Sequence, residues 1–565
     1  MTKKKHIVTS ALLYANGPIH IGHIAGAYLP ADIYVRYLRS KQEDVVFICG
    51  SDEHGAAITL QAKKEKISPK KIIDKYHDLN KNTFENFGIS FDIYDRTSEE
   101  LHHETAQEFF KNLHEKNVFI KKENKQFYDE ENNQFLADRY IIGVCPKCGH
   151  DHAYGDQCEK CGAALNPEEL INPKSSISGN TPVLKETTHW YLPMHKDESW
   201  LNTWIKDGLL NGKNHHNVKE WKKQVIGQCK SWIDGGLKDR AMTRDLDWGV
   251  KLPIEGNEGK VLYVWLDAPI GYISATKKWA LENNKNWEDY WKNHNTNLIH
   301  FIGKDNIVFH CIMFPILLKA HGEYILPNNI PANEFLNLEG KKLSTSKNWA
   351  IWLHEYLADF KGQEDALRYT LCATAPENKD SDFTWKDFQA RNNNELVSIY
   401  GNFVNRVVVL INKYWNGIIP ESNALTEYDE NIIALLLSYP DKIGKLIEQY
   451  EFKKALQELM NLARLGNKYL ADTEPWKEIK TNECYAKTVM NIAVQIAASL
   501  SILSKPFMPF TAKKLCNILS IEELVWKEAK KLILKKGHKI NSGDHLFLKI
   551  EDEEIKTQLK KLQLQ

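Results

Sequence analysis

A short turn near the amino terminus carries two histidines around a glycine, in the order His20-Ile21-Gly22-His23. Imidazole N–H groups can donate hydrogen bonds to phosphate oxygens, and glycine lets a ligand approach the backbone closely. If a helix begins here, its first free N–H groups and its positive dipole end also face the ligand. The turn therefore predicts a phosphate site, although by itself it fits a capped helix with half-exposed histidines equally well.

A lysine-rich segment far downstream offers complementary charge. Residues 341–347 contain three lysines and three hydroxyl side chains, directly after Gly340. Lysine ammonium groups are flexible point charges that suit a polyphosphate, and hydroxyls donate to its oxygens. Most lysine-rich loops are simply solvated, so this segment gains meaning only beside the histidine turn. Together the two segments predict that a polyphosphate is held from two sides.

Four of the ten cysteines form two C-x-x-C pairs, with nine residues between the pairs. Thiolate pairs at this spacing fit a tetrahedral zinc ion, and a disulfide is disfavoured in a reducing cytosol. Because four cysteines leave no open coordination position, we predict one structural zinc that fixes a small insertion. Its predicted ligands are Cys145, Cys148, Cys158 and Cys161.

Hydrophobic patterning predicts the elements that position these groups. Residues 7–14 form an apolar run typical of a buried strand, and residues 24–39 have helical periodicity. A second strand, 45–49, precedes Asp52, and open parallel sheets place their ligands at such carboxyl ends. From residue 388 onward the pattern becomes almost wholly helical. These patterns indicate a strand, a helix and a second strand near the amino terminus and helices in the carboxyl-terminal region.

The histidine turn and the lysine segment resemble the paired HIGH and KMSKS signatures of the class I aminoacyl-tRNA synthetases. The second match is imperfect, because Thr345 stands where the family usually has its second lysine. Lys347 or Lys341 is a candidate for the missing charge, by spacing alone.

Four further segments resemble the methionine-specific branch of that family. The resemblance extends over nearly the whole chain. It departs from the family pattern at Leu13, where proline is common, and at Asn306, where some relatives carry isoleucine. The four segments are residues 8–14, 49–55, 263–272 and 301–310.

The resemblance implies a methionine pocket. A linear thioether fits a flexible apolar slot, because sulfur packs well against aromatic rings. Asp52 is implied to face the substrate ammonium and Arg244 its carboxylate. Trp265 and Tyr272 taken alone are typical of core packing, whereas the joint match favours the pocket. The implied methionine-binding residues are Leu12, Tyr14, Asp52, Arg244, Trp265, Ala268, Pro269, Tyr272, Asn306 and His310.

The resemblance also implies a two-step reaction. The methionine carboxylate attacks the α-phosphate of ATP, and the terminal ribose hydroxyl of the tRNA then takes the acyl group. Because a carboxylate is already nucleophilic, catalysis should come from alignment and placed charge, with Mg²⁺ shielding the polyphosphate. The implied catalytic residues are His20, His23, Lys342, Ser344 and Lys347, and the implied ATP-binding residues are Gly22, Asp305, Leu343 and Thr345, with Asp305 on the ribose.

The helical region carries the residues implied to contact RNA. Asn402 and Arg406, four residues apart, share one helix face and could contact base edges together. Trp476 follows a helix-start signal that we expect to hold its indole at an exposed corner, where an unpaired base can stack. By pattern alone Trp476 is more often a core residue and the other two are solvated. The resemblance implies that all three contact the CAU anticodon of tRNA(Met), the initiator tRNA included.

The chain is long enough for several domains, and its composition excludes few classes of protein. The chain has 565 residues with 74 basic and 74 acidic side chains, so bulk charge does not indicate a nucleic-acid partner. No apolar run reaches the roughly 18–20 residues of a membrane span. We expect a cytoplasmic enzyme with no membrane contact.

The resemblance implies an α/β fold: a doubly wound parallel, Rossmann-like catalytic domain split by the zinc-knuckle insertion, followed by an α-helical bundle that binds the anticodon. The tail is too short for the dimerising domain that some relatives append, so a monomer is expected. Ser175 and Ser178 stand where relatives with two zinc sites carry cysteines, which favours one zinc. The expected divisions are 1–117 and 232–325 for the two halves of the catalytic domain, 118–231 for the insertion, 326–387 for the linker domain with the lysine loop, 388–548 for the anticodon-binding domain and 549–565 for the tail.

Four alternative functions are disfavoured by the sequence. The isoleucine, leucine and valine enzymes carry a large editing insertion, for which the interval between residues 117 and 232 is too small. A cysteine-specific enzyme needs thiol ligands at its pocket, and Cys49 alone does not provide them. An RNA-binding paralogue without strong activity has only Thr345 in its favour. A small-molecule nucleotidyltransferase would not need the long helical region.

Overall fold

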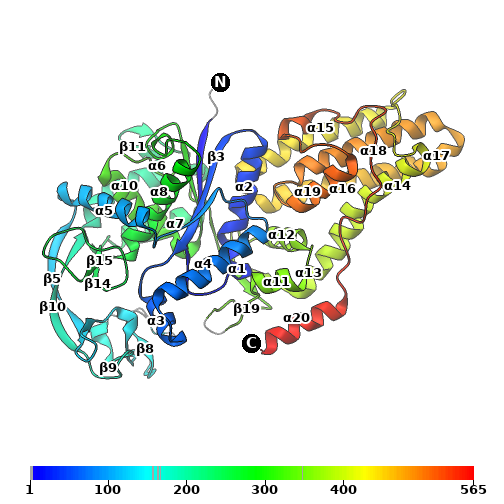
Figure 1. Ribbon diagram of the computed structural model, residues 1–565. Helices are drawn as coiled ribbons and strands as arrows, with labels where there is room; N and C mark the ends of the chain where they lie inside the picture. Colours follow the sequence, from blue (N-terminus) through cyan, green and yellow to red (C-terminus); the bar gives the residue numbers. More distant parts are fainter. Residues whose placement is uncertain are drawn as a thin grey trace.

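The computed structural model describes residues 4–155, 158, 160–161, 165, 167–345 and 348–564. Its amino-terminal half is built on a parallel sheet in the order β17-β16-β1-β3-β2, with β4 also paired to β3 (Figure 1). The predicted α/β fold is confirmed. The strands are β1 (Lys5–Ser10), β2 (Leu13–Tyr14), β3 (Asp44–Asp52), β4 (Ile93–Arg96), β16 (Asn297–Gly303) and β17 (Ala332–Asn333).

Helices cover both faces of this sheet, because side chains alternate along each strand. Ile7 and Val46 belong to a core shared with α5, α8 and α10, whereas Val8 and Phe47 belong to a core shared with α2. All four side chains are at most 1% exposed, as expected for a parallel sheet. The helices of this half are α2 (Leu29–Ser40), α3 (Ala56–Glu65), α4 (Pro69–Asn86), α5 (Glu100–Glu115), α8 (Val264–Glu282), α9 (Glu288–Trp291) and α10 (Phe314–His321).

The first strand is shorter than the predicted run 7–14. β1 ends at Ser10, and after a bend β2 pairs with the end of β3, which places Tyr14 beside Asp52. The prediction of one continuous strand is therefore wrong. The apolar run continues through the bend, so hydrophobicity alone does not reveal it.

The insertion between the two halves of the sheet consists mainly of antiparallel strands. Its long hairpin-like pair, β5 and β10, belongs to a four-stranded sheet, and the cysteines lie beside the three-stranded sheet β8-β7-β9. Ser175, at a position where relatives with two zinc sites carry cysteine, donates a hydrogen bond to Asp129 at 2.6 Å. The elements are β5 (Ile120–Asp129), β6 (Gln134–Phe135), β7 (Ile141–Val144), β8 (Ala153–Tyr154), β9 (Ile171–Ser175), β10 (Val183–Leu192), α6 (Glu198–Asp207), β11 (Leu209–Leu210), β12 (Lys213–Asn214), α7 (Lys223–Asp234), β13 (Arg240–Ala241), β14 (Thr243–Asp245) and β15 (Lys260–Leu262).

The linker that follows the sheet contains a tight hairpin bearing the lysine segment. Glu339 and Gly340 both have positive φ, 49° and 74°, as a two-residue hairpin turn of the I′ kind requires. This turn aligns Lys341 and Lys342 in β19. The elements are β18 (Leu336–Leu338), β19 (Lys341–Lys342), α11 (Leu353–Asp359), α12 (Glu364–Ala373), β20 (Ser381–Phe383) and α13 (Trp385–Arg391).

A helical bundle forms the carboxyl-terminal part, on the right of Figure 1. Its helix α18 is apolar and long enough to span a membrane, but 94% of its most apolar window is buried inside the protein, which accounts for its composition. The helices are η8, a π-helix (Asn392–Gly401), α14 (Asn402–Trp415), α15 (Glu427–Glu448), α16 (Phe452–Thr473), α17 (Pro475–Thr481), α18 (Glu483–Leu503), α19 (Pro509–Leu519) and α20 (Asp552–Leu564).

The region after α19 is not helical as predicted. Residues 520–551 contain one short 3-10 element, η9 (Trp526–Lys530), and otherwise follow the bundle as extended chain. Ile419 and Gly537 explain this course, because backbone hydrogen bonds join the two segments around them. Ile540, which is 1% exposed, anchors the same stretch in the core.

A buried arginine joins the three parts of the molecule. Arg368 of α12 donates to Asp32 of α2 at 2.6 Å and to the carbonyl oxygen of Phe507, which follows α18, at 3.0 Å. The side chains of Arg368 and Asp32 are fully buried. Burial acts to raise the pKa of Asp32, but Arg36 and Arg368 outweigh it and lower the pKa to about 2. The catalytic half, the linker and the bundle therefore meet at one charged junction.

Candidate active site and metal site

The histidine turn caps the helix that follows the sheet bend. The helix begins at Ile21 rather than residue 24, and passes from α1 (Ile21–His23) through the π-helical turn η1 (Ile24–Tyr28) into α2. The N–H of Gly22 donates to Nδ1 of His20, and the N–H of His20 donates to Nδ1 of His23, both at 3.2 Å. Since each Nδ1 accepts a hydrogen bond, each neutral ring carries its proton on Nε2.

The electrostatic state of the pair follows from its burial. Burial lowers the pKa of His23 to about 4 and the pKa of His20 well below its usual value, with His23 lowering the latter further. The two rings stack with centroids 3.7 Å apart. Both are therefore neutral near pH 7 and act as N–H donors, not as cations.

The segment that follows the lysine loop is hydrogen-bonded to the histidine turn, and the loop itself packs over Gly22. The N–H of Ile21 donates to the carbonyl oxygen of Ile351 at 3.1 Å, and the N–H of Leu353 donates to that of Ile19 at 2.9 Å. A Cβ on Gly22 would lie 2.7 Å from Cδ1 of Leu343. Glycine therefore lets the lysine loop pack closely over the turn, and a larger residue would displace the Leu343 side chain.

The two motifs line one cleft of about 430 Å³. Of the two candidates for the missing lysine, Lys341 lies on the opposite side of β19, with its ammonium 4.6 Å from the ring of Trp349. Ser344 pairs through its backbone with Trp349, and Lys347 lies outside the described residues. The predicted residues that line this cleft are Leu12, Tyr14, His20, Gly22, His23, Asp305, Asn306, Lys342, Leu343 and Thr345.

One apolar face of helix α8 lies next to this cleft. Trp265, Ala268, Pro269 and Tyr272 of α8 recur at helical spacing, so they share one face. Next to this face, a Cβ on Gly271 would lie 2.8 Å from Cδ1 of Leu12, a cleft residue.

Histidine 310 completes this wall from another helix. The hydroxyl of Tyr272 and Nε2 of His310 are 2.9 Å apart, and Nδ1 of His310 lies 3.0 Å from the carbonyl oxygen of Asn306. His310 stands in the π-helical turn η7 (Phe309–Met313), and π-turns are frequent at functional sites. Arg244 lies apart from the described cleft lining, with its guanidinium 4.1 Å from the ring of Tyr263.

Asp52 is the last residue of β3 and is 4% exposed. Burial, and secondarily the nearby Asp267, raises the pKa of its carboxyl to about 8. Its Oδ1 accepts the backbone N–H of His54 at 3.3 Å. A carboxyl with a pKa near 8 is mostly protonated at pH 7. An ammonium beside it would lower this pKa and restore the negative charge, so the site favours a cationic partner.

A buried His–Asp–His cluster adjoins Asp52, and sequence reasoning missed it. Asp267 lies 2.7 Å from Nδ1 of His54 and 2.5 Å from Nε2 of His102, whose Nδ1 is 2.9 Å from Oγ of Ser274. Burial acts to raise the pKa of Asp267, but the two histidines hold it well below its usual range. His54 and Asp267 lie in segments 49–55 and 263–272, two of the four that resemble the methionine-specific branch. Their presence in these segments could have indicated the cluster.

The four predicted zinc ligands converge. Their sulfur atoms all lie within 4.8 Å of one another. Sγ of Cys145 is 3.9 Å from that of Cys161, and Sγ of Cys148 is 3.6 Å from that of Cys158. Tetrahedral zinc with Zn–S bonds of about 2.3 Å separates its sulfurs by roughly 3.8 Å. The four thiols therefore fit a metal ion of that size and geometry.

Two family models match the chain. One, described as tRNA synthetases class I (M), matches residues 6–408. The other, described as the anticodon binding domain of methionyl tRNA ligase, matches residues 419–563. The chain belongs to the methionyl-tRNA synthetase family of class I.

Individual relatives agree with this family. A methionine–tRNA ligase of Christiangramia forsetii is 60% identical, over 99% of this chain and 81% of the relative. The ligase of Flavobacterium psychrophilum is 59% identical over the same shares. In fold, the chain resembles Mycobacterium tuberculosis methionyl-tRNA synthetase in complex with methionyl-adenylate, with a TM-score of 0.79, 22% identity and coverage of 96% of this chain and 99% of that one.

The three predicted anticodon residues of this family member lie around α14, α16 and α17. The guanidinium of Arg406 lies over the indole of Trp476, 4.7 Å from the ring centroid. Nδ2 of Asn402 donates to Oδ1 of Asn467 at 3.2 Å. Trp476 follows the expected helix start at Pro475 and is partly buried against the bundle core, so its indole is less exposed than expected.

Proposed function

We propose that this chain is a methionine–tRNA ligase that activates methionine with ATP and transfers it to tRNA(Met). The observation that carries the proposal is one cleft in which the histidine turn faces the lysine loop. Membership of the methionyl-tRNA synthetase family over nearly the full length supports the substrate. The cleft is large enough for a nucleotide next to a small amino acid.

In the first step the methionine carboxylate oxygen attacks the α-phosphorus of ATP, and pyrophosphate leaves with the bonding electrons. The Nε2–H groups of His20 and His23 donate to phosphate oxygens, and because both rings are neutral they do so without protonation changes. Lys342 places its ammonium on the leaving pyrophosphate from the opposite side. Positioned donors of this kind act where charge develops, so no general base is needed.

The remaining cleft residues position ATP. Gly22, Leu343 and Thr345 line its phosphate end, and Asp305 lies where the ribose hydroxyls would be bound. Mg²⁺ would accompany ATP as part of the substrate and neutralise the polyphosphate. Ser344 and Lys347 remain proposed contributors from the same loop.

Methionine is proposed to lie between α8, η7 and the turn around Leu12. Its thioether would contact the aromatic and aliphatic face that ends at Tyr272 and His310. Its ammonium would pair with Asp52, whose neighbour Tyr14 borders the cleft. Trp265, Ala268, Pro269 and Asn306 complete the proposed pocket. Arg244 is proposed to contact the methionine carboxylate. Its guanidinium would have to move away from the ring of Tyr263 to do so, because the described cleft lining does not include Arg244.

The second step needs the tRNA to span the molecule. The terminal ribose hydroxyl attacks the acyl carbon of methionyl-adenylate, and AMP leaves. Asn402, Arg406 and Trp476 are proposed to contact the CAU anticodon, with the indole offering a stacking surface. We propose that initiator tRNA is a substrate too, that the chain acts as a monomer in the cytoplasm, and that the expected domain divisions hold.

The four cysteines are proposed to hold one structural zinc. The fit of their sulfur separations to tetrahedral coordination supports zinc, and four thiolates leave no position for a substrate. Such an ion would supply folding free energy to the insertion and take no part in the chemistry.

Pyrophosphate exchange tests the proposal. The purified chain is incubated with ATP and labelled pyrophosphate and with each of the twenty amino acids in turn. Exchange with methionine alone is the expected result. Exchange with another amino acid would refute the pocket, and no exchange with any amino acid would refute the activity and favour an RNA-binding paralogue.

A further inference from the structure

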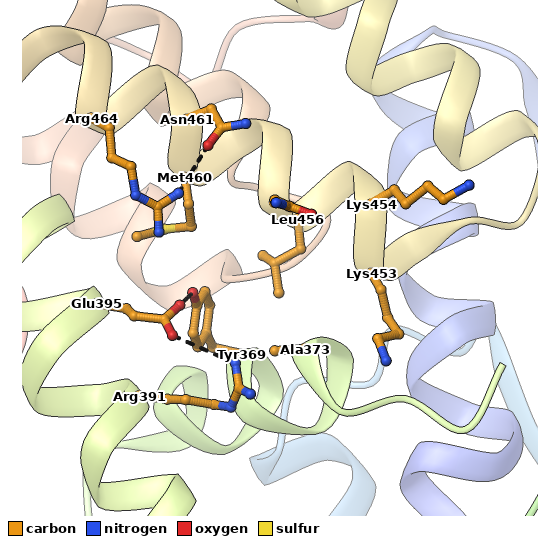
Figure 2. Close-up of a pocket in the computed structure, with 11 residues that line it drawn as sticks. Tyr369, Ala373, Arg391, Glu395, Lys453, Lys454, Leu456, Met460, Asn461 and Arg464 are labelled. Atoms are coloured by element: carbon orange, nitrogen blue, oxygen red, sulfur yellow. Dashed lines mark hydrogen bonds and ion pairs between the residues drawn. The ribbon is translucent and has the colours of Figure 1, made fainter. Parts of the chain in front are cut away.

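A second large cavity lies where the linker meets the bundle, away from the catalytic cleft. It has a volume of about 510 Å³ and opens between α12, α13 and η8 on one side and α16 on the other (Figure 2). No role in the proposed function uses it. Its lining residues are Tyr369, Ala373, Arg391, Glu395, Lys453, Lys454, Leu456, Gln457, Met460, Asn461 and Arg464.

The cavity carries unbalanced positive charge. Its single acid, Glu395, accepts a hydrogen bond from Tyr369 and lies 3.5 Å from Arg391, which also pairs with Asp387 at 2.7 Å. That side of the cavity is therefore neutralised internally, as the dashed lines of Figure 2 show for Tyr369, Glu395 and Arg391.

Two cations remain available on the α16 side. Within the described part of the chain, neither the ammonium of Lys453 nor the guanidinium of Arg464 has a carboxylate within ion-pair distance, and both side chains are exposed. Arg464 bonds only to the amide oxygen of Asn461, at 2.9 Å. Lys454, in contrast, pairs with Glu451 at 2.9 Å and extends away from the opposite wall in Figure 2.

These groups form a polar stripe along α16. Lys453, Gln457, Asn461, Arg464 and Asn467 follow one another at intervals of three or four residues, so they share one helix face. At about 1.5 Å per residue, the stripe is roughly 21 Å long. Asp and Glu do not interrupt it. Lys453, Gln457 and Arg464 are the exposed members of this stripe, and cations and amides of this kind both donate to a phosphodiester backbone.

One end of the stripe lies at the proposed anticodon contacts, and the other end is linked by hydrogen bonds to the catalytic cleft. Asn467 accepts the hydrogen bond from Asn402, so the stripe begins at the proposed anticodon contacts. At the other end, the N–H of Lys453 donates to Glu377 at 2.9 Å. The adjacent Pro376 accepts the N–H of Glu334, which lines the catalytic cleft.

We infer that the stripe and its cavity bind backbone phosphates of the tRNA between its anticodon and its acceptor end, with Lys453 and Arg464 as the principal contacts. This inference rests on the proposed function, because it takes the orientation of the tRNA from the two proposed ends. It adds a binding surface that is independent of base identity. Such contacts raise affinity for any tRNA that reaches the site and make it depend on salt.

Steady-state aminoacylation of Arg464→Ala and Lys453→Ala tests the inference. Each substitution should raise the KM for tRNA about tenfold, the fold-change expected for one charge-assisted hydrogen bond. The slope of log(kcat/KM) against log salt should become less steep by about 0.7–1 for each cation removed. Pyrophosphate exchange, which involves no tRNA, measures the first step alone in the same preparations.

Lys468→Ala is the matched control, because Lys468 lies on the same helix with a side chain 68% exposed and pairs with Asp472. It should leave the KM for tRNA unchanged. Wild-type KM and salt slope in both variants would overturn the inference, whereas absence of methionine-dependent exchange in the unsubstituted chain would overturn the proposed function instead. An acceptor-stem minihelix should be charged equally by Arg464→Ala and the unsubstituted chain. A loss as large as with full tRNA would also overturn the inference.

Discussion

Methionine binding should release a proton, because the proposed partner of its ammonium is protonated in the free protein. Burial, and secondarily Asp267, raises the pKa of Asp52 to about 8. A neutral carboxyl attracts an ammonium much less than a carboxylate does, so methionine binding must be accompanied by ionisation of Asp52. Raising the pH removes this cost, and methionine affinity should therefore increase as the pH approaches 8.

The magnitude follows from the pKa. If the bound carboxyl is ionised throughout, the apparent Kd is proportional to 1 + 10^(pKa − pH), and between about pH 6 and about pH 8 it falls about fifty-fold. The folded pKa lies above the unfolded value. The same carboxyl therefore contributes stability that is present below its unfolded pKa and is lost as the pH rises through about 8. Asp52→Asn should remove both pH dependences and weaken methionine binding about a hundredfold.

Isothermal titration calorimetry provides the assay. Titrations of methionine at three pH values, each in two buffers of different ionisation enthalpy, give both the Kd and the number of protons released. About one proton per methionine is expected on the acid side of pH 8. A Kd that stays constant over this range, with no proton release by folded protein, would refute the assignment of Asp52 or its raised pKa.

Three further predictions concern the histidine turn, the metal site and the domain junction. His23→Ala should lower the rate of methionine-dependent pyrophosphate exchange by about 10²–10³, and a near-normal rate in folded protein would exclude a donor role. Cys148→Ser should lower the bound zinc measured by atomic absorption and increase proteolysis of the insertion; full metal content would contradict the four-thiolate site. Arg368→Met should reduce the free energy of unfolding in urea by about 3–5 kcal/mol, because it leaves Asp32 buried with Arg36 as its remaining ion partner. An unchanged midpoint would show that this junction contributes little.

Much of the site could be predicted because the residues of each motif lie close together in the sequence. His20, Gly22 and His23 occupy one helix start, and their spacing alone determines that they share it. The C-x-x-C pairs are likewise short-range features, since two residues between thiols suffice for a metal knuckle. The helix after the histidine turn and the mainly helical character of residues 388–519 could also be predicted from periodicity, which short-range backbone geometry controls.

The failures have a common cause. Periodicity did not reveal the bend after Ser10 because the apolar run continues through it, and it did not reveal the extended course of residues 520–551 because a distant segment supplies its hydrogen bonds. Trp476 is less exposed than expected because a helix-start signal does not indicate which residues of the bundle cover its indole.

The sequence by itself determined which groups are available and which short stretches they occupy: the donors of the histidine turn, the lysines of the loop and the four thiols. Only the tertiary structure decided which of them meet. It set Lys342 toward the cleft and Lys341 away from it, and it brought Asp267 to His54 across 213 positions of the chain. Strand alternation and crossover connections determine such encounters. Their energies depend on burial, which is a property of the packed molecule and not of any segment of it.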